Sequence, residues 1–541
     1  MPEIPQVDVL VLGSGAAGLA AALAVARGGL SVLVVDKSPW LGGTTAMSGG
    51  CMWVPAHHRM GEVGETDSPE EALTYIRSVA PKGWAETEDA LWQSYVQAAP
   101  AMLKMLEAET PLQFTVGQEP DPYAELPGGK RRGRNVSPKA IALSVAGPLR
   151  AKLRPSTWPA IFTYNEVSDT QFLAHPWRGM MRFGWRAAWR RLTGRRAMGQ
   201  GLTAGLLAGC HARGVQFLTD APARELVIEQ DRVVGARLER NGSSEIVRAS
   251  RGVLLATGGF EWNQEMMARY LPGPVELTGS PDTNTGDGHK MAEAVGAALA
   301  HMDQSLIYPT KEITYDGRPH GLPAKDIKLP HIMLVNKHGK RFVNEVEVNL
   351  GLAFEIRDPA TRQPVNLPAW RIFDRQYVSK YSHCLPKRRE PPAMYRADTL
   401  EELARQIGVD PAGLVDSARR MTKFAHAGED KDFGRGSHIW DTQVLGDHEH
   451  GPNPILGSIE EPPFYAAPFH ASYLGTKGGT RTNEHGQALR PDGSRIAGLY
   501  AAGNAMANPI GSKAVGAGTT LGPCLTWGYI CGQSLLRENA P

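Results

Sequence analysis

The stretch that decides the fold is VDVLVLGSGAAG, from Val7 to Gly18. Its first half, Val7–Leu12, is branched and almost entirely apolar, which predicts a buried parallel strand. The Ala-rich run Leu19–Arg27 predicts a helix, and Leu30–Val35 predicts a second strand that ends at Asp36. A strand, a Gly-rich turn, a helix, a strand and an acid in this order are typical of a dinucleotide-binding βαβ unit.

Each glycine of the turn has a predicted role. Gly13 permits the tight turn, Gly15 lets the backbone approach a pyrophosphate, and Gly18 lets the helix pack against the strand. The N-terminus of the helix offers free N–H groups and the positive end of its dipole to phosphates. Asp36, 23 positions after Gly13, is suited to accept hydrogen bonds from a ribose. The alternative is an ordinary βαβ unit that binds no ligand.

A second loop of small residues indicates FAD rather than NAD. It reads GGTTAMSGG, from Gly42 to Gly50, and a flavin enzyme needs small residues where the backbone lines the isoalloxazine ring. With this loop the chain resembles the superfamily of FAD enzymes that contains fumarate reductases and 3-ketosteroid dehydrogenases. Trp53-Val54-Pro55, a few residues later, resembles the ketosteroid branch in particular.

The resemblance extends along the chain in the order that the superfamily has. The matching segments are Val253–Phe260 (an ATGG strand and turn), Thr285–Gly288 (TGDG), Gly339–Glu345 (GxRFxNE), Gly475–Gly479 (GTKGG), Gly498–Asn504 and Gly518–Pro523. Gly518–Pro523 is expected to open a last helix whose N-terminus points at the flavin N1/C2=O edge and stabilises negative charge on the reduced ring.

The resemblance implies FAD as the cofactor. No His or Cys is identifiable as an attachment point, so we expect the FAD to be non-covalent. The residues implied to bind it are Gly13, Ser14, Gly15, Ala16, Ala17, Gly18, Asp36, Lys37, Gly43, Thr44, Thr45, Ser48, Gly49, Gly50, Ala223, Ala256, Thr257, Gly258, Asp287, Gly503, Asn504, Thr520 and Leu521.

The implied fold class is α/β, with a Rossmann-like FAD-binding domain and an inserted α+β substrate domain. The FAD-binding domain is expected to be split between residues 1–280 and 465–541, with the substrate domain at 281–464. Residues 100–200 match the superfamily least, and we expect them to form helices over the site.

Two positions depart from the ketosteroid branch. In that branch a hydride passes to flavin N5, while a base removes a proton beside a ketone held by hydrogen-bond donors. The base is a Tyr that follows GxRFxNE; here the position holds Asn349, whose amide does not exchange a proton near neutral pH. The Tyr that donates to the ketone is replaced by Ala514, although its backbone partner Gly518 remains. Lys513 is either a cation for a substrate carboxylate or carbonyl, or a surface residue.

Three tyrosines are candidates for the missing role, although each is also consistent with a packed core residue whose hydroxyl is satisfied. Tyr123 lies near a second active-site Tyr of the branch. Tyr473 precedes Gly475 by two residues, and Tyr308 lies in the substrate domain. Glu347 is a further carboxylate candidate. The predicted catalytic residues are therefore Tyr123, Tyr308, Asn349, Tyr473, Lys513 and Gly518.

The leading functional hypothesis is an FAD-dependent dehydrogenase that introduces a C=C bond α,β to the ketone of a steroid or a smaller cyclic ketone. One alternative is an ene-reductase of the fumarate reductase type, and another is a non-catalytic flavin-binding protein. Because the sequence carries no haem or iron–sulfur motif, an external electron acceptor is expected.

Composition limits the partners and the compartment. The 541 residues carry a net charge of only +2, too small for a bulk nucleic-acid binder. The five Cys show no metal-ligand spacing, so no metal is expected, and reduced thiols favour the cytoplasm. Neither a signal peptide nor a membrane span is expected. Residues 177–196 combine seven Arg with Trp and Met, which indicates either peripheral contact with an anionic membrane or a solvated Arg face.

Overall fold

The computed structural model describes residues 6–538 except 158, 169–170, 272, 274–275 and 386–393. Within these residues an eight-stranded sheet has the order β21-β22-β10-β11-β1-β2-β8, with β9 paired to β10. Its central strands β8, β2, β1, β11 and β22 are parallel. The strands are β1 Val7–Leu12, β2 Val32–Val35, β8 Gln216–Leu218, β9 Ala223–Glu229, β10 Arg232–Arg240, β11 Ser243–Leu255, β21 Gln487–Leu489 and β22 Arg495–Ala501.

The predicted βαβ unit is present, with small shifts of its boundaries. β1 has the predicted limits, β2 begins two residues late at Val32, and helix α1 spans Ala16–Arg27. The helix begins at Ala16 rather than Leu19 because extended Gly15 is its N-cap, so the last residues of the Gly-rich turn already belong to the helix.

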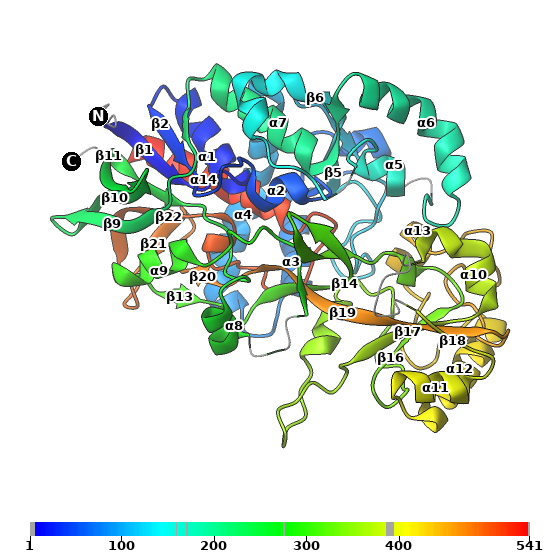
Figure 1. Ribbon diagram of the computed structural model, residues 1–541. Helices are drawn as coiled ribbons and strands as arrows, with labels where there is room; N and C mark the ends of the chain where they lie inside the picture. The colour runs from blue at the N-terminus through cyan, green and yellow to red at the C-terminus, as the bar shows by residue number, and fades with distance from the viewer. Residues whose placement is uncertain are drawn as a thin grey trace.

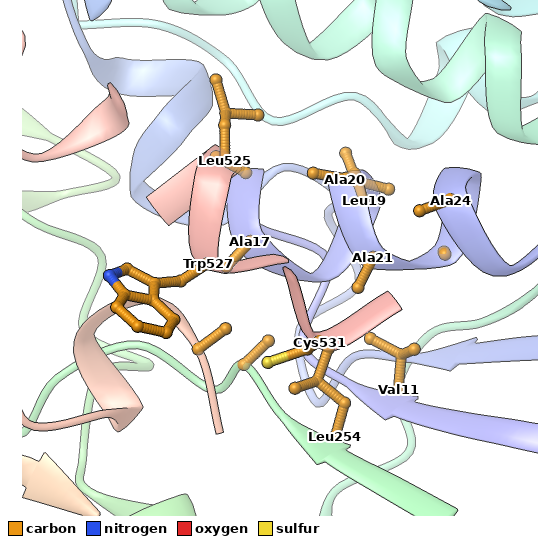
Figure 2. Close-up of a cluster of buried hydrophobic side chains, with 14 of the residues drawn as sticks. Val11, Ala17, Leu19, Ala20, Ala21, Ala24, Leu254, Leu525, Trp527 and Cys531 are labelled. Atoms are coloured by element: carbon orange, nitrogen blue, oxygen red, sulfur yellow. The ribbon is translucent and has the colours of Figure 1, made fainter. Parts of the chain in front are cut away.

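Helix α1 packs against the C-terminal helix α14, Leu521–Arg537. Figure 2 shows buried side chains of both helices in one hydrophobic cluster, among them Leu525, Trp527 and Cys531 of α14. The approach requires glycine: a Cβ at Gly528 would lie 2.2 Å from the Ala17 carbonyl oxygen. The two ends of the chain therefore build one layer, and both termini lie on the same side of the molecule (Figure 1).

A second sheet of seven strands, counted within the described residues, has the order β15-β14-β19-β17-β16, with β12 and β18 paired to β19. The strands are β12 Leu277–Thr278, β14 Ser305–Tyr315, β15 Arg318–Pro323, β16 Ile332–Val335, β17 Ala369–Phe373, β18 Tyr395–Ala397 and β19 Phe464–Thr476. β19 runs from the centre of the molecule into the second domain, which is the expected substrate domain (Figure 1). The expected boundary at 464/465 would place β19 in a different domain from the strands with which it pairs. We therefore propose that the domain boundary lies near residue 476, where β19 ends.

Helices and short strands surround the two sheets. The helices are α2 Gly43–Met47, α3 Pro69–Val79, α4 Ala85–Glu109, α5 Tyr164–Ser168, α6 Pro176–Leu192, α7 Met198–Ala212, α8 Gln264–Tyr270, α9 Asp287–Ala294, α10 Arg375–Tyr381, α11 Leu400–Ile407, α12 Pro411–Ala427 and α13 Ile439–Val444. The short strands are β3 Met52–Trp53, β4 Phe114–Val116, β5 Asn135–Pro138, β6 Ile141–Ala142, β7 Arg195–Arg196, β13 Leu299–Ala300 and β20 Gly479–Thr480. None of the described helices is both long and apolar enough to span a bilayer.

The segment 100–200, expected to form helices, contains both helices and short strands. α5 and α6 lie there, but β4 and β5 form a small antiparallel sheet with β3. This pairing uses β3, which lies outside the segment, so the segment read alone did not reveal the sheet.

Candidate active site

The Gly-rich turn after β1 has the geometry that its spacing predicts. Gly13 has φ +110°, and a Cβ there would lie 2.2 Å from the Ala256 carbonyl oxygen. A Cβ on Gly18 would lie 2.0 Å from the Gly13 carbonyl oxygen, which explains the close packing of α1 on β1. At Gly15 the nearest atom to a Cβ is Thr45 Oγ1, 3.9 Å away, so this face of the turn is open to a ligand.

Asp36 at the end of β2 is held by the same turn. Its Oδ2 accepts hydrogen bonds from the Ser14 backbone N–H (3.1 Å) and from Ser14 Oγ, while Oδ1 accepts from the Ser38 N–H. Burial raises the pKa of Asp36, against the lowering effect of these donors. The carboxyl is therefore fixed beside the turn, where a ribose hydroxyl can reach it.

One cavity of about 820 Å³ runs along this turn, within the usual size range of ligand sites. Of the residues predicted to bind the cofactor, all but Gly18 and Gly50 line it. Gly18 packs beneath Gly13, and a Cβ at Gly50 would lie 2.4 Å from the Met198 carbonyl carbon. These two glycines shape the cavity walls from behind.

Two side chains that line the cavity have polar atoms without a hydrogen-bond partner in the described residues. Asn504 Oδ1 and Thr520 Oγ1 are buried, and neither has a hydrogen-bond partner in the described part of the chain. An unsatisfied buried polar atom is costly, so a ligand with hydroxyl and amide groups fits this wall. A Cβ at Gly475 would lie 2.7 Å from Asn504 Nδ2, so only glycine leaves this amide in place. These features fit the ribityl chain and the ring edge of FAD.

Non-covalent attachment of FAD stays a prediction. Three groups of the kind that can attach a flavin, His383, Cys384 and Cys524, line the cavity. All five cysteines are free.

The part of the cavity that the predicted cofactor residues line is the cofactor cradle. Beyond it the cavity continues into a chamber built largely by the second domain. The chamber walls include aromatic and lysine side chains from α5, β14, the short 3-10 helix Asp326–Lys328, α13 and residues just outside α5 and the 3-10 helix. They are Phe162, Tyr164, Phe172, Tyr308, Lys311, Lys325, Lys328 and Trp440.

Two of the predicted catalytic residues line the cavity, Tyr308 and Gly518. Gly518 has φ +87°, and a Cβ would lie 2.5 Å from Met52 Cα, so glycine is required there. Among the described residues the Gly518 N–H finds no acceptor, whereas its carbonyl oxygen accepts from the Trp53 N–H. This N–H remains free for a substrate oxygen.

Tyr123 and Asn349 come together behind the cavity wall. The Tyr123 hydroxyl donates to Glu347 Oε1 (3.0 Å) and accepts from Asn349 Nδ2 (2.8 Å). Asn349 Oδ1 in turn accepts from the Ala514 N–H (2.8 Å). Burial and the Glu347 carboxylate raise the pKa of Tyr123. Neither Tyr123 nor Asn349 lines the cavity, so this chain of bonds tethers the Ala514–Gly518 loop.

The structure gives no support to Tyr473 and Lys513 as chamber residues. Strand β19 turns Leu474 toward the cavity and Tyr473 to the opposite face, into a buried apolar cluster. Lys513 is half-buried next to Ala514, but only Ala514 lines the cavity. Side chains alternate between the two faces of a strand, which explains why Tyr473 faces away from the cavity while Leu474 lines it.

Sequence reasoning missed a polar cluster in the chamber wall. The Tyr164 hydroxyl lies 3.1 and 3.0 Å from the two carboxylate oxygens of Glu119, to which it donates. Glu119 also accepts from Ser168 Oγ (2.7 Å) and Asn135 Nδ2 (2.6 Å). The Tyr164 ring lies beside Gly49 of the flavin loop, where a Cβ would be 3.3 Å from Cδ2. No motif marks these residues, because they meet only in the folded chain.

Lysines approach the aromatic walls of the chamber. Lys325 Nζ lies 5.0 Å from the ring centroid of Tyr164, and Lys328 Nζ lies 5.9 Å from the centroids of both Tyr308 and Trp440. Cations at such distances are attracted by the ring faces.

A different cluster, His175, Asp447 and Glu449, has donor atoms within 4.8 Å of one another. His175 Nε2 is hydrogen-bonded to Asp447, and Arg178 pairs with Glu449. Since these groups satisfy one another, the cluster does not require a metal.

A dinucleotide cradle that opens into a substrate chamber between two domains defines a flavin-dependent oxidoreductase. The chain matches the family model for the FAD binding domain over residues 8–521. It is 36% identical to 3-oxosteroid 1-dehydrogenase of Mycobacterium tuberculosis (strain ATCC 25618 / H37Rv), covering 97% of this chain and 98% of that protein. It is also 36% identical to 4-oxocyclohexanecarboxylate 2-dehydrogenase of Sinomonas cyclohexanicum, covering 98% and 93%.

A solved structure agrees with these relatives. The 3-ketosteroid Δ1-dehydrogenase of Sterolibacterium denitrificans, in complex with 1,4-androstadiene-3,17-dione, superposes with a TM-score of 0.91 at 33% identity, covering 99% of this chain and 100% of the other. The chain belongs to this FAD-binding family, and it is an FAD-dependent dehydrogenase acting on CH–CH bonds. The predicted family, α/β fold class and FAD cofactor are confirmed.

Proposed function

We propose that the protein oxidises a cyclic ketone, introducing a C=C bond next to the carbonyl, and passes the electrons to an external acceptor. The observation that carries this proposal is the single cavity that joins the dinucleotide cradle to the chamber beside Gly518. The relatives named for oxidising steroid and cyclohexane ketones support it.

The chain's own residues activate the ketone. Bound FAD supplies the hydride acceptor. The free N–H of Gly518 holds the ketone oxygen and stabilises the charge that develops on it as the α-proton leaves. The helix α14 begins at Leu521, which lines the cavity, and its N-terminus favours negative charge at that end.

Tyr164 is the proposed proton acceptor. Burial and the neighbouring Glu119 raise the pKa of Tyr164 well above its usual value, so the phenol is neutral at rest. Its hydroxyl already donates to Glu119. As the hydroxyl oxygen accepts the carbon-bound proton, the phenol proton passes to Glu119, and no free phenolate needs to form. Tyr308, on the same chamber wall, is the second candidate.

The test is an anaerobic absorbance titration of the FAD-loaded protein with saturated cyclic ketones. Bleaching of the flavin band and release of the matching enone are expected. If no ketone bleaches the protein but an enone reoxidises the reduced form, the protein is a reductase. Failure of both reactions would support a non-catalytic flavoprotein.

Helix α6 supports a further part of the proposal, a peripheral contact with an anionic membrane. Its exposed side chains include Trp177 (79% exposed), Met181 and Trp185 at four-residue spacing, followed by Leu192 (87%). The expected Arg face is only partly free, because Arg190 is buried against Glu166. The helix lies at the edge of the molecule (Figure 1), and its Gly179 packs against Phe172 of the chamber wall.

Co-sedimentation with vesicles tests this contact. The protein is expected to bind phosphatidylglycerol vesicles more than phosphatidylcholine vesicles, and less at high salt, because the Arg side chains add an electrostatic attraction. The double variant Trp177→Ser/Trp185→Ser should lose binding, while its turnover in solution is unchanged. Equal sedimentation of variant and wild type would contradict the contact.

A further inference from the structure

We infer that Lys328 binds a carboxylate of the substrate, so that the ketone oxidised by this protein is the anion of a cyclic keto acid. This inference rests on the proposed function and names the substrate class of the same chamber. Lys328 was not among the residues predicted from the sequence, where Lys513 was the candidate cation for a substrate carboxylate.

Lys328 is a buried cation without an anionic partner. Its residue is 6% exposed, and it lines the cavity. In the described residues its ammonium makes no ion pair or hydrogen bond, and it lies 5.9 Å from the ring centroids of Tyr308 and Trp440. Buried charges in proteins are normally paired, so the side chain is set to receive an anion from the cavity.

The charges around Lys328 do not cancel its own. Asp326, which also lines the cavity, is neutralised by a buried ion pair with Arg371, at 2.7 Å. Lys311 and Lys325 line the cavity as well, and neither has a salt bridge among the residues that the structure describes. Two further lining carboxylates, Asp36 and Asp287, belong to the cofactor cradle, and Glu119 is hydrogen-bonded to Tyr164. The chamber therefore has a surplus of positive charge.

Lys328 lies in the chamber and not in the cofactor cradle. The cradle is built by the turn after β1 and the loop before α2, whereas Lys328 faces Trp440 of α13 in the second domain. Its other neighbour, Tyr308, lies on β14 of the second sheet. Lys328 and Gly518 line the same cavity. In the inferred pose the substrate carboxylate meets the Lys328 ammonium, and the ketone meets the Gly518 N–H.

This arrangement selects against neutral substrates of similar shape. An apolar ring system that filled the chamber would strip water from Lys328 without supplying an anion, and that desolvation opposes binding. A keto acid anion replaces the lost water with an ion pair and with charge-assisted hydrogen bonds.

The test is binding to the FAD-loaded protein in the absence of turnover. The two probes are cyclohexanecarboxylate, which lacks the ketone, and its neutral methyl ester, measured by calorimetry and by perturbation of the flavin absorbance. Wild type is expected to bind the acid more tightly than the ester. Lys328→Met should weaken the acid about 10- to 100-fold, as for loss of a charged hydrogen bond, and leave the ester unchanged. Lys328→Arg should retain most of the acid affinity.

Lys423→Met, which removes an exposed lysine of α12, is the matched control and should bind like wild type. The inference is overturned if the ester binds as tightly as the acid, if Lys328→Met binds the acid like wild type, or if the acid does not bind. Because this assay needs no reaction, its result is independent of whether 4-oxocyclohexanecarboxylate bleaches the flavin, which tests the proposed function.

Discussion

Asn349 stands at the position where the ketosteroid branch has the Tyr that removes the substrate proton, so a different residue must act as the base here. Its amide uses both ends, donating to the Tyr123 hydroxyl and accepting from the Ala514 N–H. An amide can hold this loop from both sides but cannot take up a proton. In our proposal the proton therefore goes to Tyr164, on a different wall of the cavity.

Replacing Tyr164 by Phe should lower kcat for ketone oxidation by about 10²- to 10⁴-fold, the usual contribution of general base catalysis. The ring is retained, so the FAD content and the melting temperature should change little. Stopped-flow reduction of the flavin measures the effect. Tyr473→Phe is the control, because Tyr473 faces away from the cavity. A Tyr164→Phe variant as fast as wild type would exclude Tyr164 as the base.

The environment of the Glu355 carboxyl makes the stability of the fold depend on pH. Burial raises the pKa of this carboxyl to about 7 from the ordinary 4.5. Because the folded state holds the proton more tightly, its stabilising contribution is complete below pH 4.5 and is lost as the pH rises through 7. Glu355→Gln should thus stabilise the protein at pH 8 by roughly 1–3 kcal/mol and have little effect at pH 4.5. Thermal melts of both proteins across this range give the comparison, and parallel curves would contradict the raised pKa.

At the scale of elements, the contact of α1 with α14 links the two ends of the chain to the cofactor site. Both helices begin at residues that line the cavity. Gly528→Ala would bring a methyl group to 2.2 Å from the Ala17 carbonyl oxygen. Because this neighbour is backbone, the helices must separate, and a loss of about 1–3 kcal/mol is expected.

The melting temperature and the retention of FAD during gel filtration should both fall in Gly528→Ala. Gly61→Ala is the control, since a Cβ at Gly61 meets nothing within 4 Å. A normal melting temperature for Gly528→Ala would mean that the helix contact is looser than the structure has it.

At the scale of the whole molecule, the cofactor should hold the layers together. The cavity is lined by both ends of the chain and by the second domain, so a ligand that fills it binds only the folded state. FAD at about 100 to 1,000 times its Kd should add roughly 3–4 kcal/mol. The apoprotein should melt at a lower temperature, and added FAD should restore the difference, as differential scanning fluorimetry can show. An unchanged melting temperature would argue that FAD leaves the fold unaffected.

The sequence by itself determined the cofactor cradle, because the residues of its first part are neighbours along the chain. Gly13, Gly15 and Gly18 act through local backbone geometry and close approach, which their spacing already encodes. The α/β fold class, with its inserted substrate domain, was implied by the resemblance of the sequence motifs to the FAD-enzyme superfamily. The start of α1 moved by three residues, because Gly15 caps the helix, and β2 begins two residues later than expected.

Only the tertiary structure decided the chamber. Glu119, Tyr164 and Lys328 come from separate segments, and nothing in their local sequence shows that they share one cavity. Strand alternation turned Tyr473 away from the cavity while Tyr308 lines it. Whether a lysine is an exposed cation or a buried one without a partner depends on every group around it. That property belongs to the packed molecule, which is why the carboxylate site at Lys328 appears only there.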